Sequence, residues 1–158
     1  MKQPSKDSQP SETIWIDVKD FEFLCFNLAK ELLSFSEPIP DYSTRNIPLL
    51  ESALSAPKHS FDKKLLYPTI EGQATILFYS LIKNHPFING NKRIGVMTLL
   101  IFLALNKKWL KMSPSGLYKL AIIVSNSDPS LKDMVIKKTL DLIKKYIISF
   151  PNDKSKKP

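Results

Sequence analysis

The residues richest in chemistry lie in His85–Gly95, which reads HPFINGNKRIG. This stretch contains one of the chain's two histidines, one of its two arginines and two of its four glycines. Its Asn-Gly pair precedes a long apolar run, which predicts a loop that leads into the N-terminus of a helix. Backbone N–H groups at a helix N-terminus lack intrahelical partners, and the helix dipole is positive there. The stretch therefore predicts an anion-binding site.

The side chains of this stretch can be given roles in phosphate chemistry. Gly90 lets the backbone approach a phosphate closely, and Asn91 can donate its amide to a phosphate oxygen. Arg93 can bind phosphate oxygens in bidentate fashion, while Lys92 acts as a point charge. Histidine exchanges protons near neutral pH, so His85 is the candidate general base that would deprotonate an attacking hydroxyl.

The net charge of +8 is distributed unevenly along the chain. No Asp or Glu occurs from Gly72 to Ser127, whereas seven Lys and Arg residues lie in that stretch. Such a region carries a positive potential and favours an anionic ligand, which could be a nucleotide, a nucleic acid or an acidic protein. A solvated basic face without a partner would have the same composition.

The chain has 158 residues, of which 43% are hydrophobic, and this is the size of one domain. Its single cysteine, Cys25, cannot form an internal disulfide. Polar composition predicts disordered tails at residues 1–12 and 151–158 around one domain, residues 13–150. The longest apolar stretch, Val96–Leu105, is about half as long as a membrane span, and no secretory signal is recognisable. We expect a cytoplasmic protein with no membrane partner.

The spacing of apolar residues, caps and prolines predicts an all-α domain. Thr69 and either Ser113 or Ser115 are candidate N-caps. Val96–Leu105 is apolar on every side, so this helix is expected to be buried on every side. Residues 56–68, bounded by prolines, are expected to form a loop able to fold back as a small β-hairpin. The expected helices span about residues 17–32, 49–54, 69–84, 91–106, 113–125 and 126–148.

The central stretch closely resembles the motif of the Fic/Doc family, which is His-any-Phe-any-acid-Gly/Ala-Asn-Gly/Lys-Arg. Lys92, in place of glycine, is similar to the Doc, or death-on-curing, branch. The resemblance extends upstream through Leu49–Leu54, Tyr67–Thr69 and Ile82–Asn84, and covers about residues 45–125. The matching motif residues are His85, Phe87, Gly90, Asn91, Lys92 and Arg93.

The resemblance implies a compact Fic-type helical bundle, with the motif loop between two central helices and residues 56–68 as a flap. That flap would bind a target segment by adding a strand. The resemblance also implies ATP or another nucleotide, Mg²⁺, and a target protein that is modified on a Ser or Thr hydroxyl. Typical Fic enzymes transfer AMP, whereas Doc-type toxins transfer the terminal phosphate from a nucleotide bound the other way round. A translation factor is a candidate target, and an antitoxin protein a candidate inhibitor.

The sequence departs from the family motif at one position. The acidic residue that usually holds Mg²⁺ is replaced by Asn89, which is therefore the candidate metal ligand in this chain. An amide oxygen can ligate Mg²⁺ but brings no charge, whereas carboxylates usually hold this ion. Glu51, Asp62 and Glu71 are alternative carboxylates, located far from the motif in the sequence.

Three functions are compatible with these features. The leading hypothesis is a Doc-like toxin or Fic-domain transferase that moves phosphate or AMP, with His85 as general base and residues 90–93 binding phosphate. The second is a non-catalytic Fic-like module that binds a nucleotide or a partner and is weakened by Asn89. The third is a basic helical nucleic-acid-binding domain; charge is its only support, so we do not expect a nucleic-acid partner.

Overall fold

The computed structural model describes residues 12–33 and 37–151. The predicted tails, 1–12 and 151–158, lie outside these residues except for Glu12 and Pro151. The elements in chain order are α1 (Val18–Phe21), a π-helix (Glu22–Phe26), α2 (Asn27–Leu33), a 3₁₀ turn (Tyr42–Thr44), α3 (Ile47–Ser55), a second 3₁₀ turn (Ala56–Lys58), β1 (Ser60–Phe61), β2 (Lys64–Leu65), α4 (Ile70–Asn84), α5 (Asn91–Leu105), β3 (Lys108–Leu110), α6 (Pro114–Asn126), a third 3₁₀ turn (Pro129–Leu131), α7 (Lys132–Tyr146) and β4 (Ile147–Ser149).

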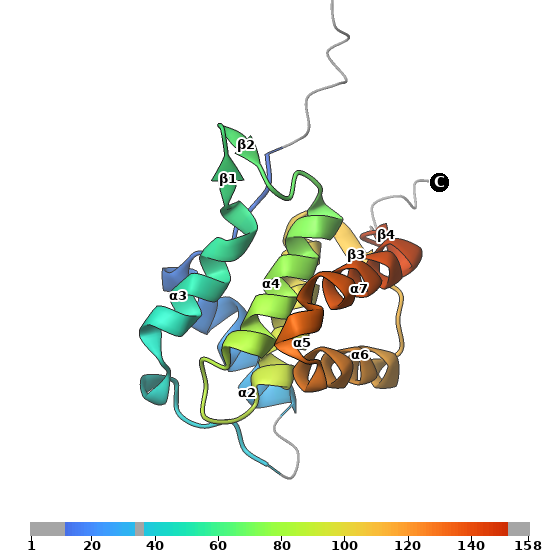
Figure 1. Cartoon of the computed structure of the whole chain (residues 1–158). Coiled ribbons are helices and arrows are strands. Elements are labelled where there is room, and N and C mark those ends of the chain that lie inside the picture. The colour runs from blue at the N-terminus through green and yellow to red at the C-terminus, as the bar shows by residue number, and fades with distance from the viewer. Residues whose placement is uncertain (1–11, 34–36, 152–158) are drawn as a thin grey trace, which may run out of the picture.

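Helix α4 lies at the centre of the bundle (Figure 1), and α3, α5 and α7 all pack against it. It begins where predicted, because the Thr69 hydroxyl accepts a hydrogen bond from the Gly72 N–H at 3.0 Å. Every residue from Gly72 to Tyr79 is buried. The prediction of a mainly helical fold, with the motif loop between two central helices, is confirmed.

Helix α5 differs from its prediction in one respect. Ile94, Leu99, Phe102 and Leu103 are buried in the core, but the opposite side of the helix is only partly covered. The expectation that Val96–Leu105 is buried on every side is therefore wrong. An apolar helix face exposed in this way is available to line a binding cavity.

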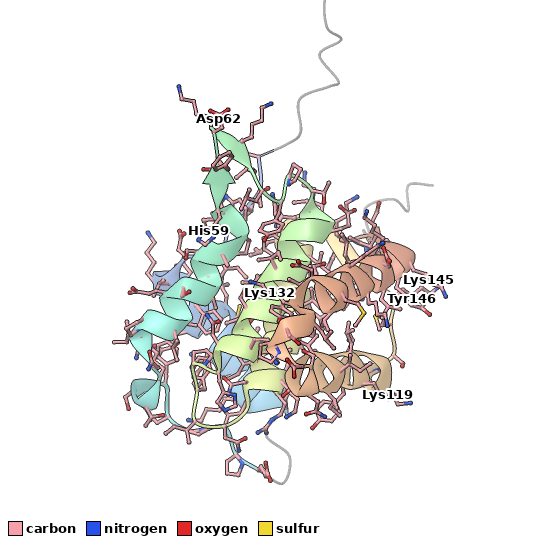
Figure 2. The ribbon with its side chains drawn as sticks, in the orientation of Figure 1. His59, Asp62, Lys119, Lys132, Lys145 and Tyr146 are labelled. Carbon is pink, nitrogen blue, oxygen red and sulfur yellow. The ribbon has the colours of Figure 1, made fainter. Side chains whose placement is uncertain are left out.

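The hairpin expected within residues 56–68 is present. β1 and β2 pair antiparallel, with Ser60 opposite Leu65 and Phe61 opposite Lys64. The turn residues Asp62 and Lys63 both have positive φ, at 50° and 63°, which is the backbone geometry of a type I′ hairpin turn. Figure 2 shows Asp62 at the tip of this hairpin, which projects from the bundle.

A second two-stranded sheet was not predicted. β3 pairs antiparallel with β4, with Lys108 opposite Ser149 and Leu110 opposite Ile147. The expected helix to residue 148 is therefore wrong at its end, because α7 stops at Tyr146 and the chain continues as a strand. Among the described residues, no helix is both long enough and apolar enough to cross a membrane.

Candidate active site

The motif loop begins and ends in left-handed backbone conformations. His85 terminates α4 with φ 54° and ψ 52°. This conformation is common after a helix, although glycine or asparagine usually adopts it. Gly90 precedes α5 with φ 85°, so the loop between the two central helices reverses the chain within a few residues. The His85 side chain is left exposed at the loop's mouth.

Gly90 is required at its position by space as well as by conformation. A Cβ atom built there would lie 2.9 Å from Ile39 Cγ1, which is closer than real carbon atoms approach. The same Cβ position lies 3.5 Å from Arg93 Nη2. The Ile39 side chain therefore fills the space where a side chain of residue 90 would lie, and the Arg93 guanidinium lies close to the N-terminus of α5, where an anion is favoured.

Asn91 holds the motif loop closed. Its side-chain oxygen accepts a hydrogen bond from the Phe87 N–H at 3.0 Å, and its amide donates to the Phe87 carbonyl at 2.8 Å. The side chain is buried. The sequence assigned this amide to a phosphate oxygen, but in the structure its polar atoms bind the loop backbone. The phosphate contact of Asn91 remains a prediction, and its structural role is one that the sequence did not reveal.

Phe87 anchors the loop in the core. Its ring lies within an aromatic cluster, at centroid distances of 5.3 Å from Phe26, 6.2 Å from Phe21 and 6.3 Å from Tyr42. These partners come from the first helices and the turn that follows them. The aromatic cluster holds the Phe87 side chain in the core, and the Asn91 side chain holds the loop backbone through its two hydrogen bonds.

A cavity of about 700 Å³ opens beside the loop. This volume is in the range of small-molecule and cofactor sites. The structure places all six of the predicted site residues at this cavity: His85, Asn89, Gly90, Asn91, Lys92 and Arg93. The sequence did not predict the rest of the wall, because it comes from segments far apart in the chain. That wall includes Val96, Met97 and Leu100 of α5, Pro114, Leu117 and Tyr118 of α6, and Leu33, Glu37 and Ser125.

Arg93 is partly committed to the fold. Its Nη1 donates to the backbone carbonyls of Leu33, at 3.0 Å, and Glu37. These bonds leave Nη2 beside Gly90 at the N-terminus of α5. The guanidinium is thereby held in place before any ligand arrives, which lowers the entropy cost of binding an anion.

The carboxylates suggested by the sequence do not line the cavity. Glu51, Asp62 and Glu71 are absent from its wall, and Asp62 lies at the hairpin tip (Figure 2). Among the described lining residues the one acidic side chain is Glu37. The motif end of the cavity is therefore mainly cationic, as the acid-free stretch from Gly72 to Ser127 predicted.

Comparison with protein families identifies the chain. A model of the Fic/DOC family matches residues 16–103, which are more than half of the sequence. The chain belongs to the Fic/DOC family. The Fic/DOC match runs from before α1 to near the end of α5, so it includes the whole motif loop and the β1–β2 hairpin. No match was found among curated proteins or among solved structures.

Fic/DOC proteins typically use a nucleotide and Mg²⁺. A nucleotide fits the cavity, which offers a cationic helix N-terminus at one end and apolar side chains along α5 and α6. A Mg²⁺ ion held by the protein fits poorly. The Asn89 Oδ1 already accepts the Gly90 N–H at 2.8 Å, and no three His, Cys, Asp or Glu side chains gather as a metal site within the described residues.

Proposed function

We propose that this Fic/DOC protein transfers a phosphate-bearing group from ATP, or another nucleotide, to a Ser or Thr hydroxyl of a target protein, as a Doc-like member of the family. The observation that supports the proposal is that His85 and the N-terminus of α5 line the same cavity. The candidate base, His85, and the phosphate-binding N-terminus of α5 thus lie at the two ends of one short loop.

In the proposed step His85 accepts the proton of the target hydroxyl as its oxygen attacks the phosphorus atom. The new bond joins that oxygen to phosphorus, and the bond from phosphorus to the bridging oxygen of the leaving group breaks. For the terminal phosphate the leaving group is a nucleoside diphosphate. Backbone N–H groups at Asn91 and Lys92 and the Arg93 guanidinium stabilise the charge on the transferred group. The proton remains on His85 until solvent takes it.

The shape of the cavity supports transfer of the terminal phosphate over transfer of AMP. Its apolar wall, formed by Val96, Met97 and Leu100 of α5 and by Leu117 and Tyr118 of α6, lies beyond Arg93 along the helix. A nucleoside on this wall would direct its phosphate chain towards Gly90, so the phosphate nearest His85 would be the last one. Lys92 at the motif position similar to Doc points in the same direction.

The β1–β2 hairpin is the proposed docking element for the target. It is short and has free edges, and Phe61 at its end is 78% exposed. A target segment that adds a strand there would be held by backbone hydrogen bonds. The hairpin precedes the start of the 15-residue helix α4 and His85 ends it, so a target docked there would have to extend about 22 Å along α4 to bring its hydroxyl residue to His85. We propose that the target is cytoplasmic, with a translation factor as the candidate, and that a separate antitoxin protein restrains the activity.

The experiment that tests the proposal uses ATP labelled at the α- or the γ-phosphate, with Mg²⁺, Mn²⁺ and cell extract. The matched control is His85→Asn, because asparagine tolerates the left-handed backbone at this position and lacks the imidazole. His85→Ala places a residue less tolerant of φ 54° there. His85→Asn therefore separates loss of the base from damage to the loop.

Label on a target from the γ-phosphate, lost in His85→Asn, is the expected result. Label from the α-phosphate that depends on His85 would establish AMP transfer in its place. Label that persists in His85→Asn, while the variant keeps its melting temperature, would remove His85 as the base.

A non-catalytic nucleotide-binding module is the second candidate, and the metal-poor site favours it. Asn89 supplies no charge, and its oxygen is engaged with Gly90. Saturable ATP binding by the wild type, with no transfer at any concentration of Mg²⁺ or Mn²⁺, would establish this alternative. Binding measured by calorimetry does not depend on the unknown target.

A further inference from the structure

The unpredicted β3–β4 sheet, here called the ribbon, lies at the other end of α5 from the motif loop. Helix α5 has 15 residues, which corresponds to about 22 Å. The family match ends at residue 103, so the ribbon is outside it. Figure 1 shows the ribbon beside the end of α7 and well separated from the β1–β2 hairpin.

Side chains on the ribbon alternate between the core and solvent. Leu110 is 1% exposed and faces the core, opposite Ile147, which packs against the same core. Because successive residues of a strand point to opposite faces, Trp109 and its partner Ile148 face away from the core. Ile148 is accordingly 39% exposed.

The pairing continues beyond the assigned strands. The Phe150 N–H donates to the Lys107 carbonyl, and the Lys111 N–H donates to the Tyr146 carbonyl, each at 2.9 Å. Phe150 is 45% exposed, and its ring meets that of Trp109 edge-to-face at 5.8 Å. The exposed ring of Phe150 and the half-buried ring of Trp109 therefore lie together on the outer side of the ribbon.

Exposed lysines lie on the segments that form or adjoin the ribbon. Lys107 and Lys111 are exposed, two residues on either side of Trp109, and Lys144 and Lys145 are exposed in the last turn of α7. Figure 2 shows Lys145 at this end of the helix. None of these four lysines lies within ion-pair distance of a carboxylate in the described part of the chain. The ribbon face thus combines unpaired positive charge with exposed aromatic surface.

From the sequence, charge was the only support for a nucleic-acid partner and none was expected; the aromatic pair on the ribbon adds a second feature. We propose that the ribbon face binds single-stranded nucleic acid, with Trp109 and Phe150 contacting bases and the four lysines contacting phosphates. A single strand of nucleic acid matches both the aromatic rings and the lysines, because each nucleotide carries a flat base that can stack and a negatively charged phosphate. An acidic peptide would use the lysines but leave the rings without a matching surface. A membrane would favour apolar residues on one face and cations on the other, whereas here Trp109 lies between Lys107 and Lys111, each two positions away in the chain.

The first experiment measures fluorescence anisotropy of a labelled single strand of about 12 nucleotides, titrated with the full chain at low and at physiological salt. Excess ATP is included so that the cavity at the motif loop is not the binding site. Binding that weakens linearly in a log–log plot against salt is expected. Absence of binding at low salt would overturn the proposal.

The variant Lys107→Gln/Lys111→Gln tests the charge, and Phe150→Ala tests the stacking. The double variant is expected to weaken binding about tenfold and to reduce the salt slope by about one to two. Phe150→Ala is expected to weaken binding at least about fivefold with the slope unchanged. The matched control is Lys137→Gln/Lys138→Gln, which removes the same charge from exposed positions of α7 and should alter binding less than about twofold.

Three results would contradict the proposal. Equal weakening by the control pair would show that net charge alone drives binding. Displacement of the strand by polyglutamate as readily as by unlabelled strand would show a site for acidic chains in general. Retention on phosphatidylserine vesicles together with no binding of the strand would assign the face to a membrane surface.

Discussion

The side chain of Asn91 binds both backbone polar groups of Phe87, so two residues of the motif form a closed unit inside the loop. Each bond would be modest at the surface, but Asn91 is buried, so loss of either bond would leave a polar group of the loop without a partner.

Asn91→Ala is expected to lower the free energy of unfolding by about 2–4 kcal/mol, because it leaves the Phe87 N–H and carbonyl without partners. Thermal unfolding followed by circular dichroism measures the effect. An ionised Asp in Asn91→Asp keeps the acceptor for the Phe87 N–H but lacks a donor to the Phe87 carbonyl, whereas a protonated one regains a donor, so its loss of stability should be smaller at acid pH. An unchanged melting temperature in Asn91→Ala would show that the loop does not depend on these bonds.

Gly90→Ala is expected to destabilise the fold by about 1–3 kcal/mol through backbone strain alone, with the contact to Ile39 adding to it. Gly116→Ala is the matched control, since Gly116 has helical backbone and its nearest neighbour is the movable Ser113 hydroxyl at 3.1 Å. Chemical denaturation of both variants gives the comparison. Equal stability of the two would mean that the space at Gly90 is not restricted.

Burial raises the pKa of the Cys25 thiol to about 12, and a hydrogen bond with Thr98 opposes this rise only in part. In the unfolded chain the thiol loses its proton near pH 9, whereas in the folded chain it keeps the proton to about pH 12. The contribution of this thiol to the free energy of unfolding is therefore fully present below pH 9. It is lost as the pH rises from 9 to about 12, at about 1.4 kcal/mol per pH unit. Cys25→Ala should lack this dependence of stability on pH, and chemical denaturation at about pH 8, 9.5 and 10.5 would show the difference. Rapid reaction of native Cys25 with a thiol reagent at neutral pH would contradict the burial.

Asn89→Asp is expected to increase affinity for Mn²⁺ or Mg²⁺ in the presence of ATP, because a carboxylate adds charge and can still accept the Gly90 N–H. Electron paramagnetic resonance of Mn²⁺ with ATP measures this without any target protein. Asn84→Asp adds the same charge near the start of the loop but outside the cavity wall, and serves as the control. Equal metal affinity in all three proteins would place the ion away from residue 89.

The sequence predicted those parts of the molecule that depend on local patterns. Thr69 capping, the boundaries of α4 and α5 and the loop between them all follow from neighbours a few residues apart. The β3–β4 ribbon was missed because its strands are three residues long and pair across nearly forty residues of chain. Ile147 and Ile148 continue the apolar spacing of α7, so nothing local distinguishes strand from helix there.

The candidate site likewise has a part that local sequence predicted and a part that depends on contacts between distant segments. The motif residues were found because they are consecutive, whereas Tyr118 and Glu37 reach the cavity only through helix packing. The second role of Arg93, binding the carbonyls of Leu33 and Glu37, could not be foreseen, because a side chain that contacts backbone leaves no signature in its partner's residue type.

The anchoring of Phe87 has a consequence for how such motifs persist. Phe87, Gly90 and Asn91 are required by the shape of the loop, whereas His85 is exposed and makes no side-chain hydrogen bond within the described residues. Selection for a stable fold would therefore preserve most of the motif even after selection for the reaction had ceased. In such lineages the histidine and the metal position would drift first, while the rest of the motif continued to mark the family.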